Sequence, residues 1–195
     1  MYPNLYGQAN WRSHPSCPSG KTRHASFEKD KVFLQVPHIA LRIVEPADNH
    51  CMSFLIIDKV HAGAVIFDAR GQLHGAALAL LGLASPDDSA PGINHRKLSS
   101  IRPDERTTPE GCFAASRDRE VNDREMLWVD YDSAIALHQV AKGAPPPERR
   151  GQRLNSPSPD DNHISCGFIN MPLKFYELLV IQRFTDTIAI VYILP

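Results

Sequence analysis

The apolar residues of this chain come in short runs, and this feature limits the elements that the chain can form. The runs Phe54–Ile57, Ala64–Phe67 and Ile188–Leu194 hold four to seven residues each and are rich in β-branched side chains. Runs of this length fit strands better than helices, which need about ten residues or more. None approaches the roughly 18 apolar residues of a membrane-spanning helix. We therefore expect a mainly β fold with no transmembrane segment.

The composition agrees with one folded domain. The chain has 195 residues, of which 43% are hydrophobic, and it contains 16 prolines. A proline content of about 8% is above the usual ~5% and favours loops and strands over a helical bundle. The formal net charge is −1. A protein that binds nucleic acid by neutralising phosphates needs a basic excess, so we expect no nucleic-acid partner.

The first 50 residues show no hydrophobic period, and we expect a disordered or loosely packed segment there, followed by one domain over residues 51–195. Within that domain Phe54–Ile57 and Ala64–Phe67 predict a β-hairpin. The run Gly75–Gly82 fits either a helix or a buried strand. Long loops are expected at 85–110 and 142–162. The remaining expected elements are strands at Leu127–Tyr131, Ala134–Val140 and Ile188–Leu194, and a helix from Leu173 to about Arg183 that begins at Pro172.

The four cysteines, Cys17, Cys51, Cys112 and Cys166, form no C-x-x-C pair. A zinc ribbon and a thioredoxin-type redox motif are therefore not supported, and we expect no metal and no cofactor. We expect free thiols that behave as small hydrophobic side chains, with Cys112 buried. The first 30 residues lack the apolar stretch of a secretory signal. Either the protein stays in the cytoplasm or its natural start lies elsewhere.

Several segments in order resemble the L,D-transpeptidase catalytic domain, the YkuD-type fold. The hairpin 54–68 resembles the opening hairpin of that family, and Thr107–Phe113 contains its T-P-x-G-x-F turn. His138 resembles the first histidine of the family. Ile164–Asn170 resembles the nucleophile motif S-[HY]-G-C-[IV]-[RN]. The resemblance covers Phe54 to Pro195, and it implies a β-rich α+β sandwich with one or two short helices.

The resemblance also implies a chemistry. In this family a cysteine thiolate attacks an amide of a peptidoglycan stem peptide, and an amine of a neighbouring stem peptide resolves the thioester into a cross-link. The partners would be peptidoglycan stem peptides, and the location would be the cell envelope or periplasm. Such a thiol needs a nearby imidazole that lowers its pKa. Backbone N–H groups must stabilise the developing oxyanion, a role that Gly167 suits.

This sequence departs from the family motif at the nucleophile. Phe168 occupies the cysteine position, and phenylalanine can neither ionise nor form a thioester. Cys166 lies two residues earlier, on the same face of an extended segment but about 6.6–7 Å away. Two alternatives follow. Cys166 acts as the nucleophile with His138 or His163 as its base, or it is an inert thiol in a groove that has lost its chemistry.

The other motif residues carry weaker expectations. Ser165, Gly167, Phe168 and Asn170 are candidate substrate contacts, although Asn170 also suits a turn, and His138 also suits a hydrogen-bonded position in a strand. The pairs Asp87–Asp88 and Asp160–Asp161 suggest paired carboxylates or a metal site, but aspartates beside proline and serine are typical of solvated turns. Three functions stay open: an impaired L,D-transpeptidase, a non-catalytic peptidoglycan-binding module, and a cytoplasmic domain of unrelated role.

Overall fold

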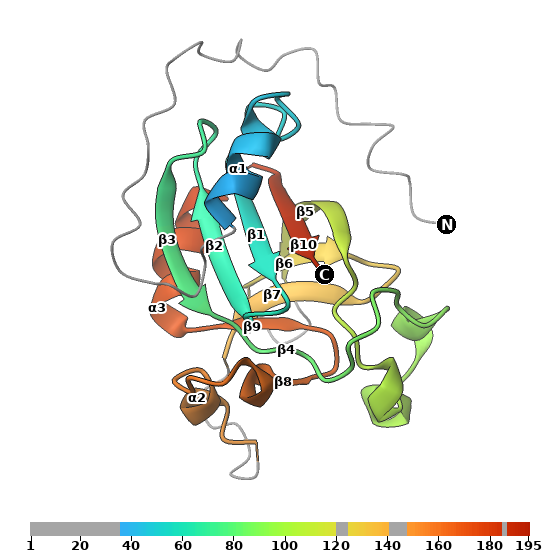
Figure 1. Cartoon of the computed structure of the whole chain (residues 1–195). Helices are drawn as coiled ribbons and strands as arrows, with labels where there is room; N and C mark the ends of the chain where they lie inside the picture. The colour runs from blue at the N-terminus through green and yellow to red at the C-terminus, as the bar shows by residue number, and fades with distance from the viewer. Residues whose placement is uncertain (1–35, 120–124, 141–147, 185–186) are drawn as a thin grey trace.

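The computed structural model describes residues 36–119, 125–140, 148–184 and 187–195. In this part of the chain one large mixed sheet forms the body of the protein, with its strands in the order β3-β2-β1-β10-β5-β6-β7-β9 (Figure 1). Its members are β1 (Phe54–Asp58), β2 (Gly63–Phe67), β3 (Leu73–Leu78), β5 (Gly111–Arg119), β6 (Glu125–Asp130), β7 (Ile135–Gln139), β9 (Ile169–Met171) and β10 (Ala189–Leu194). The short strands β4 (Leu81–Gly82) and β8 (His163–Ser165) pair separately. The mainly β fold class with short helices is confirmed.

The first three strands form an antiparallel meander. β1 pairs with β2 as predicted, and β2 pairs with β3. The ambiguous run at 75–82 is therefore extended rather than helical. Gly75 has a packing reason, because a Cβ atom there would lie 2.5 Å from the Leu179 side chain. The absence of a side chain lets the C-terminal helix approach this strand closely.

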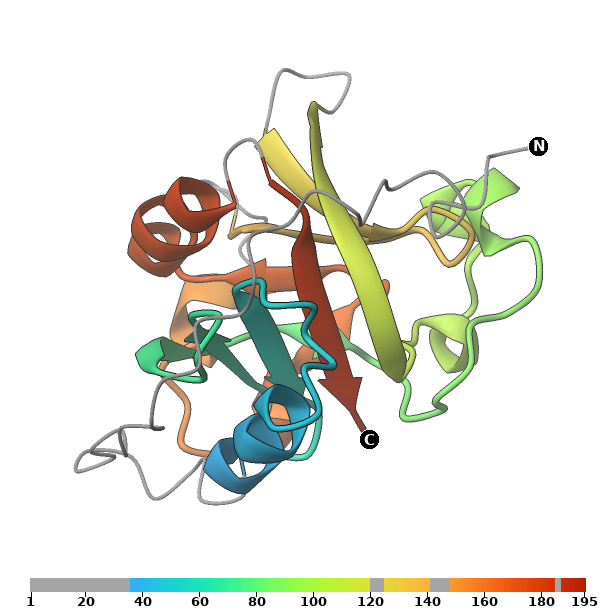
Figure 2. The same cartoon turned by 90° about the horizontal axis from the view of Figure 1, so that it is seen from above.

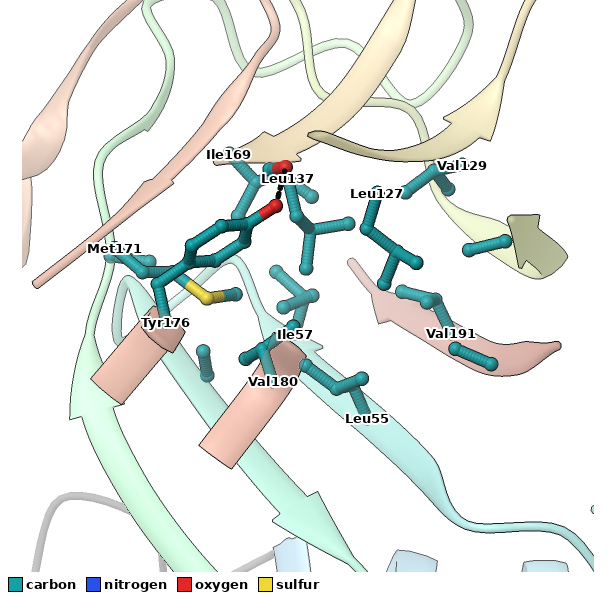
Figure 3. Close-up of a cluster of buried hydrophobic side chains, with 14 of the residues drawn as sticks. Leu55, Ile57, Leu127, Val129, Leu137, Ile169, Met171, Tyr176, Val180 and Val191 are labelled. Carbon is teal, nitrogen blue, oxygen red and sulfur yellow. Dashed lines mark hydrogen bonds between the residues drawn. The ribbon is translucent and has the colours of Figure 1, made fainter. Parts of the chain in front are cut away.

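The sheet bends so that its two halves share one hydrophobic core. Leu55 and Ile57 of β1 belong to the same buried cluster as Leu127 of β6 and Leu137 of β7 (Figure 3). This arrangement is sandwich-like, and it explains why β1 is buried along its whole length. A helix fills the open side of the core. Its Tyr176 is 2% exposed and donates a hydrogen bond of 3.0 Å to the Leu137 carbonyl oxygen.

That helix is the C-terminal one, and it begins where the sequence predicts. Pro172 precedes α3 (Leu173–Phe175), which continues into the π-helical segment η8 (Tyr176–Ile181). The other short helical elements are α2 (Arg150–Arg153) and the 3-10 turns η4 (Ile93–His95), η5 (Leu98–Ser100), η6 (Pro103–Glu105) and η7 (Pro159–Asn162). No helix in the described ranges has the length and apolar character needed to cross a lipid bilayer.

The outer face of the sheet is covered by α1 (Val36–Val44), on the side opposite to α3 (Figure 2). Val36, Ala40 and Ile43 form its buried stripe and contact a second apolar cluster that includes the stacked rings of Phe54 and Phe67. Residues 36–44 are thus an ordered part of the domain, unlike the loose segment expected up to residue 50. The spacing of four and three residues between the buried positions is the helical signal in this region. Residues 1–35 lie outside the described part.

The cysteines also differ from expectation. Cys51 is disulfide-bonded, whereas Cys112 and Cys166 are free thiols. Cys112 is exposed rather than buried, because it stands near the beginning of β5 at an end of the sheet. The expectation of four free thiols is wrong, since no sequence spacing reveals which cysteines the tertiary fold brings together.

Candidate functional site

Parallel pairing between β7 and β9 builds the site. In this pairing His138 stands opposite Asn170, two residues after Phe168. The rings of His138 and Phe168 meet edge to face, with their centroids 5.6 Å apart and their planes at 69°. The aromatic ring at the motif's nucleophile position therefore lies directly against the imidazole. This contact is the central geometric feature of the site.

The imidazole of His138 is oriented by the backbone. Its Nδ1 lies 2.8 Å from the carbonyl oxygen of Gln139. Because a carbonyl oxygen only accepts hydrogen bonds, Nδ1 carries the proton in this contact and Nε2 is the basic nitrogen. The ring is held in a tautomer that suits a general base. The contacts of His138 are thus compatible with both expectations, a catalytic base and a hydrogen-bonded histidine in a strand.

Phe168 belongs to a small aromatic cluster near the surface. The Trp128 ring lies 6.5 Å from the Phe168 ring in an edge-to-face arrangement, and Trp128 stacks on Tyr131 at 4.8 Å. All three rings, and the His138 ring, are half-buried. Position 168 is therefore at the margin of the fold and not in the hydrophobic interior. An aromatic surface occupies the place where the motif would present sulfur.

Ser165 shapes the turn between β8 and β9. It is 2% exposed. Its hydroxyl donates to the Phe168 carbonyl oxygen at 2.7 Å and accepts the Gly167 N–H at 3.0 Å. Both bonds of the hydroxyl therefore lie within the turn. They also use the Gly167 N–H, which therefore does not point at an oxyanion.

Gly167 has a steric role that the sequence did not reveal. Its φ is +119°, and a Cβ atom there would lie 2.7 Å from the Thr107 carbonyl oxygen. The neighbouring Thr108 donates from Oγ1 to the Gly167 carbonyl oxygen at 2.9 Å and accepts the Gly82 N–H at 2.8 Å. The T-P-x-G-x-F segment thus holds the nucleophile motif in place. The threonine that precedes the proline was the only sequence signal for this contact.

Asn170 is fully buried and joins the turn to the preceding loop, which contains α2. Its side-chain N–H₂ donates to the Phe168 carbonyl oxygen at 3.1 Å, and its Oδ1 accepts from Arg150 at 2.9 Å. Arg150 also pairs with Glu148. The amide of Asn170 is therefore committed to protein partners on both sides, as expected for a residue that orders the turn.

The two cysteine–histidine alternatives fare differently. Cys166 is a half-buried free thiol beside Gly167. The ring of His163 faces the backbone, because Nδ1 lies 3.0 Å from the Gly82 carbonyl oxygen and Nε2 lies 3.1 Å from the Lys59 carbonyl oxygen. The ring of His138, by contrast, contacts the ring of Phe168.

Metal chemistry has no visible basis in the described ranges, since they hold no group of three or more His, Cys, Asp or Glu side chains arranged to bind a metal ion.

Comparison with solved structures shows a distant likeness. The structure of an L,D-transpeptidase (Yku) from Stackebrandtia nassauensis aligns with 74% of this chain at 10% identity and a TM-score of 0.41. The alignment spans 56% of the length of that chain. No family model matches the sequence, and no curated protein matches it. The likeness concerns the general fold and says nothing about the substitution at position 168.

Proposed function

We propose that this domain is a catalytically impaired protein of the L,D-transpeptidase type that binds peptidoglycan stem peptides without turning them over. The observation that carries the proposal is the contact between Phe168 and His138, with ring centroids 5.6 Å apart. A base of suitable tautomer faces a ring that cannot be deprotonated. Acyl transfer through a thioester requires sulfur at that place, and oxyanion stabilisation alone does not form an acyl-enzyme.

The binding half of the proposal is supported by the turn itself. Ser165, Gly167 and Asn170 are held by buried hydrogen bonds, so the turn has a defined shape without any ligand. The half-buried rings of Trp128, Tyr131 and Phe168 offer apolar contact area beside it. Preorganised surfaces bind peptides with a smaller loss of entropy than flexible ones. The motif resemblance supplies the identity of the peptide as the stem peptide of peptidoglycan.

An envelope location is part of the same proposal. Disulfides persist in oxidising compartments such as the periplasm and the cell surface, and they are rare in the cytosol. The disulfide at Cys51 supports an extracytoplasmic location on grounds independent of the motif resemblance.

A second candidate function is an active transpeptidase that uses Cys166. One observation favours it: Cys166 is a free, half-buried thiol two residues from the nucleophile position. The tautomer of His138 would serve such a thiol. Against it, transfer of a proton needs contact near 3 Å, and the ring of Phe168 already lies against the imidazole.

Carbapenem labelling separates the two candidates. We expect intact-protein mass spectrometry to show no adduct on the wild-type chain and an adduct at position 168 on Phe168→Cys. Adding His138→Ala to Phe168→Cys should slow labelling about 100-fold, since the base is lost. Phe168→Ala is the matched control and should not be labelled. An adduct on Cys166 of the wild-type chain would instead establish the active enzyme.

Peptide binding is tested separately by sedimentation with purified peptidoglycan sacculi. The wild-type chain and Phe168→Cys should both co-sediment with sacculi. Digestion of the stem peptides with an amidase should abolish sedimentation of the wild-type chain. If the wild-type chain stays in the supernatant with intact sacculi, the proposed binding function is wrong.

A further inference from the structure

A cavity lies beside the motif turn, and the proposed function does not use the residues that line it. It has a volume of about 540 Å³ and is formed by the turn after β1, the segment after β4, and the region of η7 and β8. Cavities of roughly 300–1,000 Å³ are typical for small-molecule ligands. Neither His138 nor Phe168 lines it.

The rim of this cavity gathers exposed apolar side chains. Val60 is 64% exposed and Leu83 is 43% exposed, and both line the cavity. In the described part of the chain the other large apolar residues this exposed are Leu98 and Leu178, neither of which lines it. Neighbouring apolar groups at the mouth of a concave site are a feature of ligand-binding surfaces.

Some charged side chains of the cavity have an ionic partner in the protein and others do not. The Lys59 side chain is only 8% exposed and its ammonium pairs with Asp87. His163 directs its ring nitrogens at backbone carbonyl oxygens. Asp160 is exposed, and within the described residues no cationic side chain pairs with its carboxylate. The charge that the protein leaves available to a ligand is therefore negative.

The two aspartate pairs of the sequence contribute one member each to this cavity. Asp87 and Asp160 line it, whereas Asp88 and Asp161 do not. Asp161 accepts a hydrogen bond from Ser156 at 2.5 Å, which ties it to its own loop. The prediction of solvated turns thus describes only part of each pair. The neighbouring aspartates also provide matched controls.

We propose that this cavity binds a primary ammonium group carried on an aliphatic stem, the chemistry of a lysine-like side chain in a peptide. The ammonium pairs with the Asp160 carboxylate, and the methylene groups contact Val60 and Leu83. Lys59 and Asp87 also line the cavity, and as an ion pair they add no net charge to it. This site is independent of the contact between His138 and Phe168.

The test is a titration followed by ¹H–¹⁵N NMR on the full chain. The probe is Nα-acetyl-L-lysine methylamide, and the matched probe without charge is Nα-acetyl-L-norleucine methylamide. We expect the lysine probe to cause saturable shifts of the amide signals of Val60, Leu83 and His163, with a dissociation constant of about 1 mM or above. The norleucine probe should bind at least about fivefold more weakly, as measured by its dissociation constant. Equal binding of both probes, or no saturable shift, would overturn the proposal.

Two exposed substitutions locate the contacts without disturbing the core. Asp160→Asn should weaken the lysine probe about fivefold, and Asp88→Asn should leave its affinity unchanged. Leu83→Gln should weaken it about threefold, whereas Leu98→Gln, at a similarly exposed leucine outside the cavity, should not. The NMR spectra report folding of each variant in the same experiment. Unchanged affinity in Asp160→Asn would place the ammonium elsewhere and would refute the assignment.

Discussion

The motif turn, residues 163–170, and the long loop, residues 85–110, are both irregular, but they are held in different ways. The motif turn depends on buried bonds to partners far away in sequence, such as Thr108 to Gly167. The long loop is held mainly by local surface contacts, such as the pair of hydrogen bonds from Arg96 to Glu105. The two segments meet at Thr107 and Thr108, where the loop packs on the turn.

The difference shows that the shape of the motif turn does not depend on whether the site is reactive. Buried hydrogen bonds contribute to stability whether or not the site reacts, because breaking one leaves an unsatisfied polar group in the interior. The bonds that give the motif turn its shape do not involve the side chain of Phe168. The long loop has such distant contacts at its two ends, where Asp87 pairs with Lys59 and Thr108 bonds to Gly167.

The largest loss of stability is expected from a substitution at Gly167. Gly167→Ala should lower the free energy of unfolding by about 3 kcal/mol, because the positive φ is strained for alanine and its Cβ would meet the Thr107 carbonyl oxygen. Urea denaturation measures the change. Gly151→Ala is the control, since nothing lies within 4 Å of a Cβ atom there. Equal stability of the two variants would mean that the turn is not held as described.

The next largest loss of stability is expected at Thr108, where the long loop contacts the motif turn. Thr108→Val keeps the side-chain shape but removes the hydroxyl that serves both the Gly167 carbonyl oxygen and the Gly82 N–H. We expect a loss of about 2 kcal/mol in the free energy of unfolding. Thr187→Val, at an exposed threonine, should change it by less than about 0.5 kcal/mol. A small effect at Thr108 would show that loop and turn are not coupled.

A smaller effect is expected from the aromatic ring itself. Phe168 is half-buried, so Phe168→Ala should cost about 1 kcal/mol, less than truncation of a core phenylalanine. In a Trp11→Phe background, Trp128 reports on the cluster, and its emission should shift to the red when the neighbouring ring is lost. Phe168→Leu should retain more of the stability. Unchanged emission would contradict the contact between the two rings.

The smallest effect concerns the long loop and pH. The hydrogen bonds from Arg96, followed by the Arg102 N–H, lower the pKa of Glu105 from 4.5 to about 2. Since the folded pKa lies below the ordinary value, the ionised carboxylate stabilises the loop above about pH 4.5, and this contribution is lost as the pH falls toward 2. Carboxyl ¹³C NMR titration measures the pKa. Arg96→Gln should raise it strongly and Arg102→Gln only slightly, because the Arg102 backbone donor remains.

Much of the fold could be predicted from the sequence, because strand formation leaves a local pattern. The hairpin 54–67, the strands near 127–140 and 188–194, and the helix after Pro172 were all predicted from short apolar runs and turn residues. The helix at 36–44 was missed, although Val36, Ala40 and Ile43 have helical spacing. Its apolar pattern covers only two turns and lies among polar residues, so the sequence gives only a weak helical signal there.

The sequence by itself determined the order of the strands along the chain and the presence of His138 on one of them. Only the tertiary structure decided what each polar group of the motif does. His163 bonds to the carbonyl of Lys59 across 104 positions, and Thr108 bonds to Gly167 across 59. The physical reason is range: alternation of apolar side chains is set between neighbours, whereas the partner of a buried hydrogen bond is chosen by packing between segments distant along the chain.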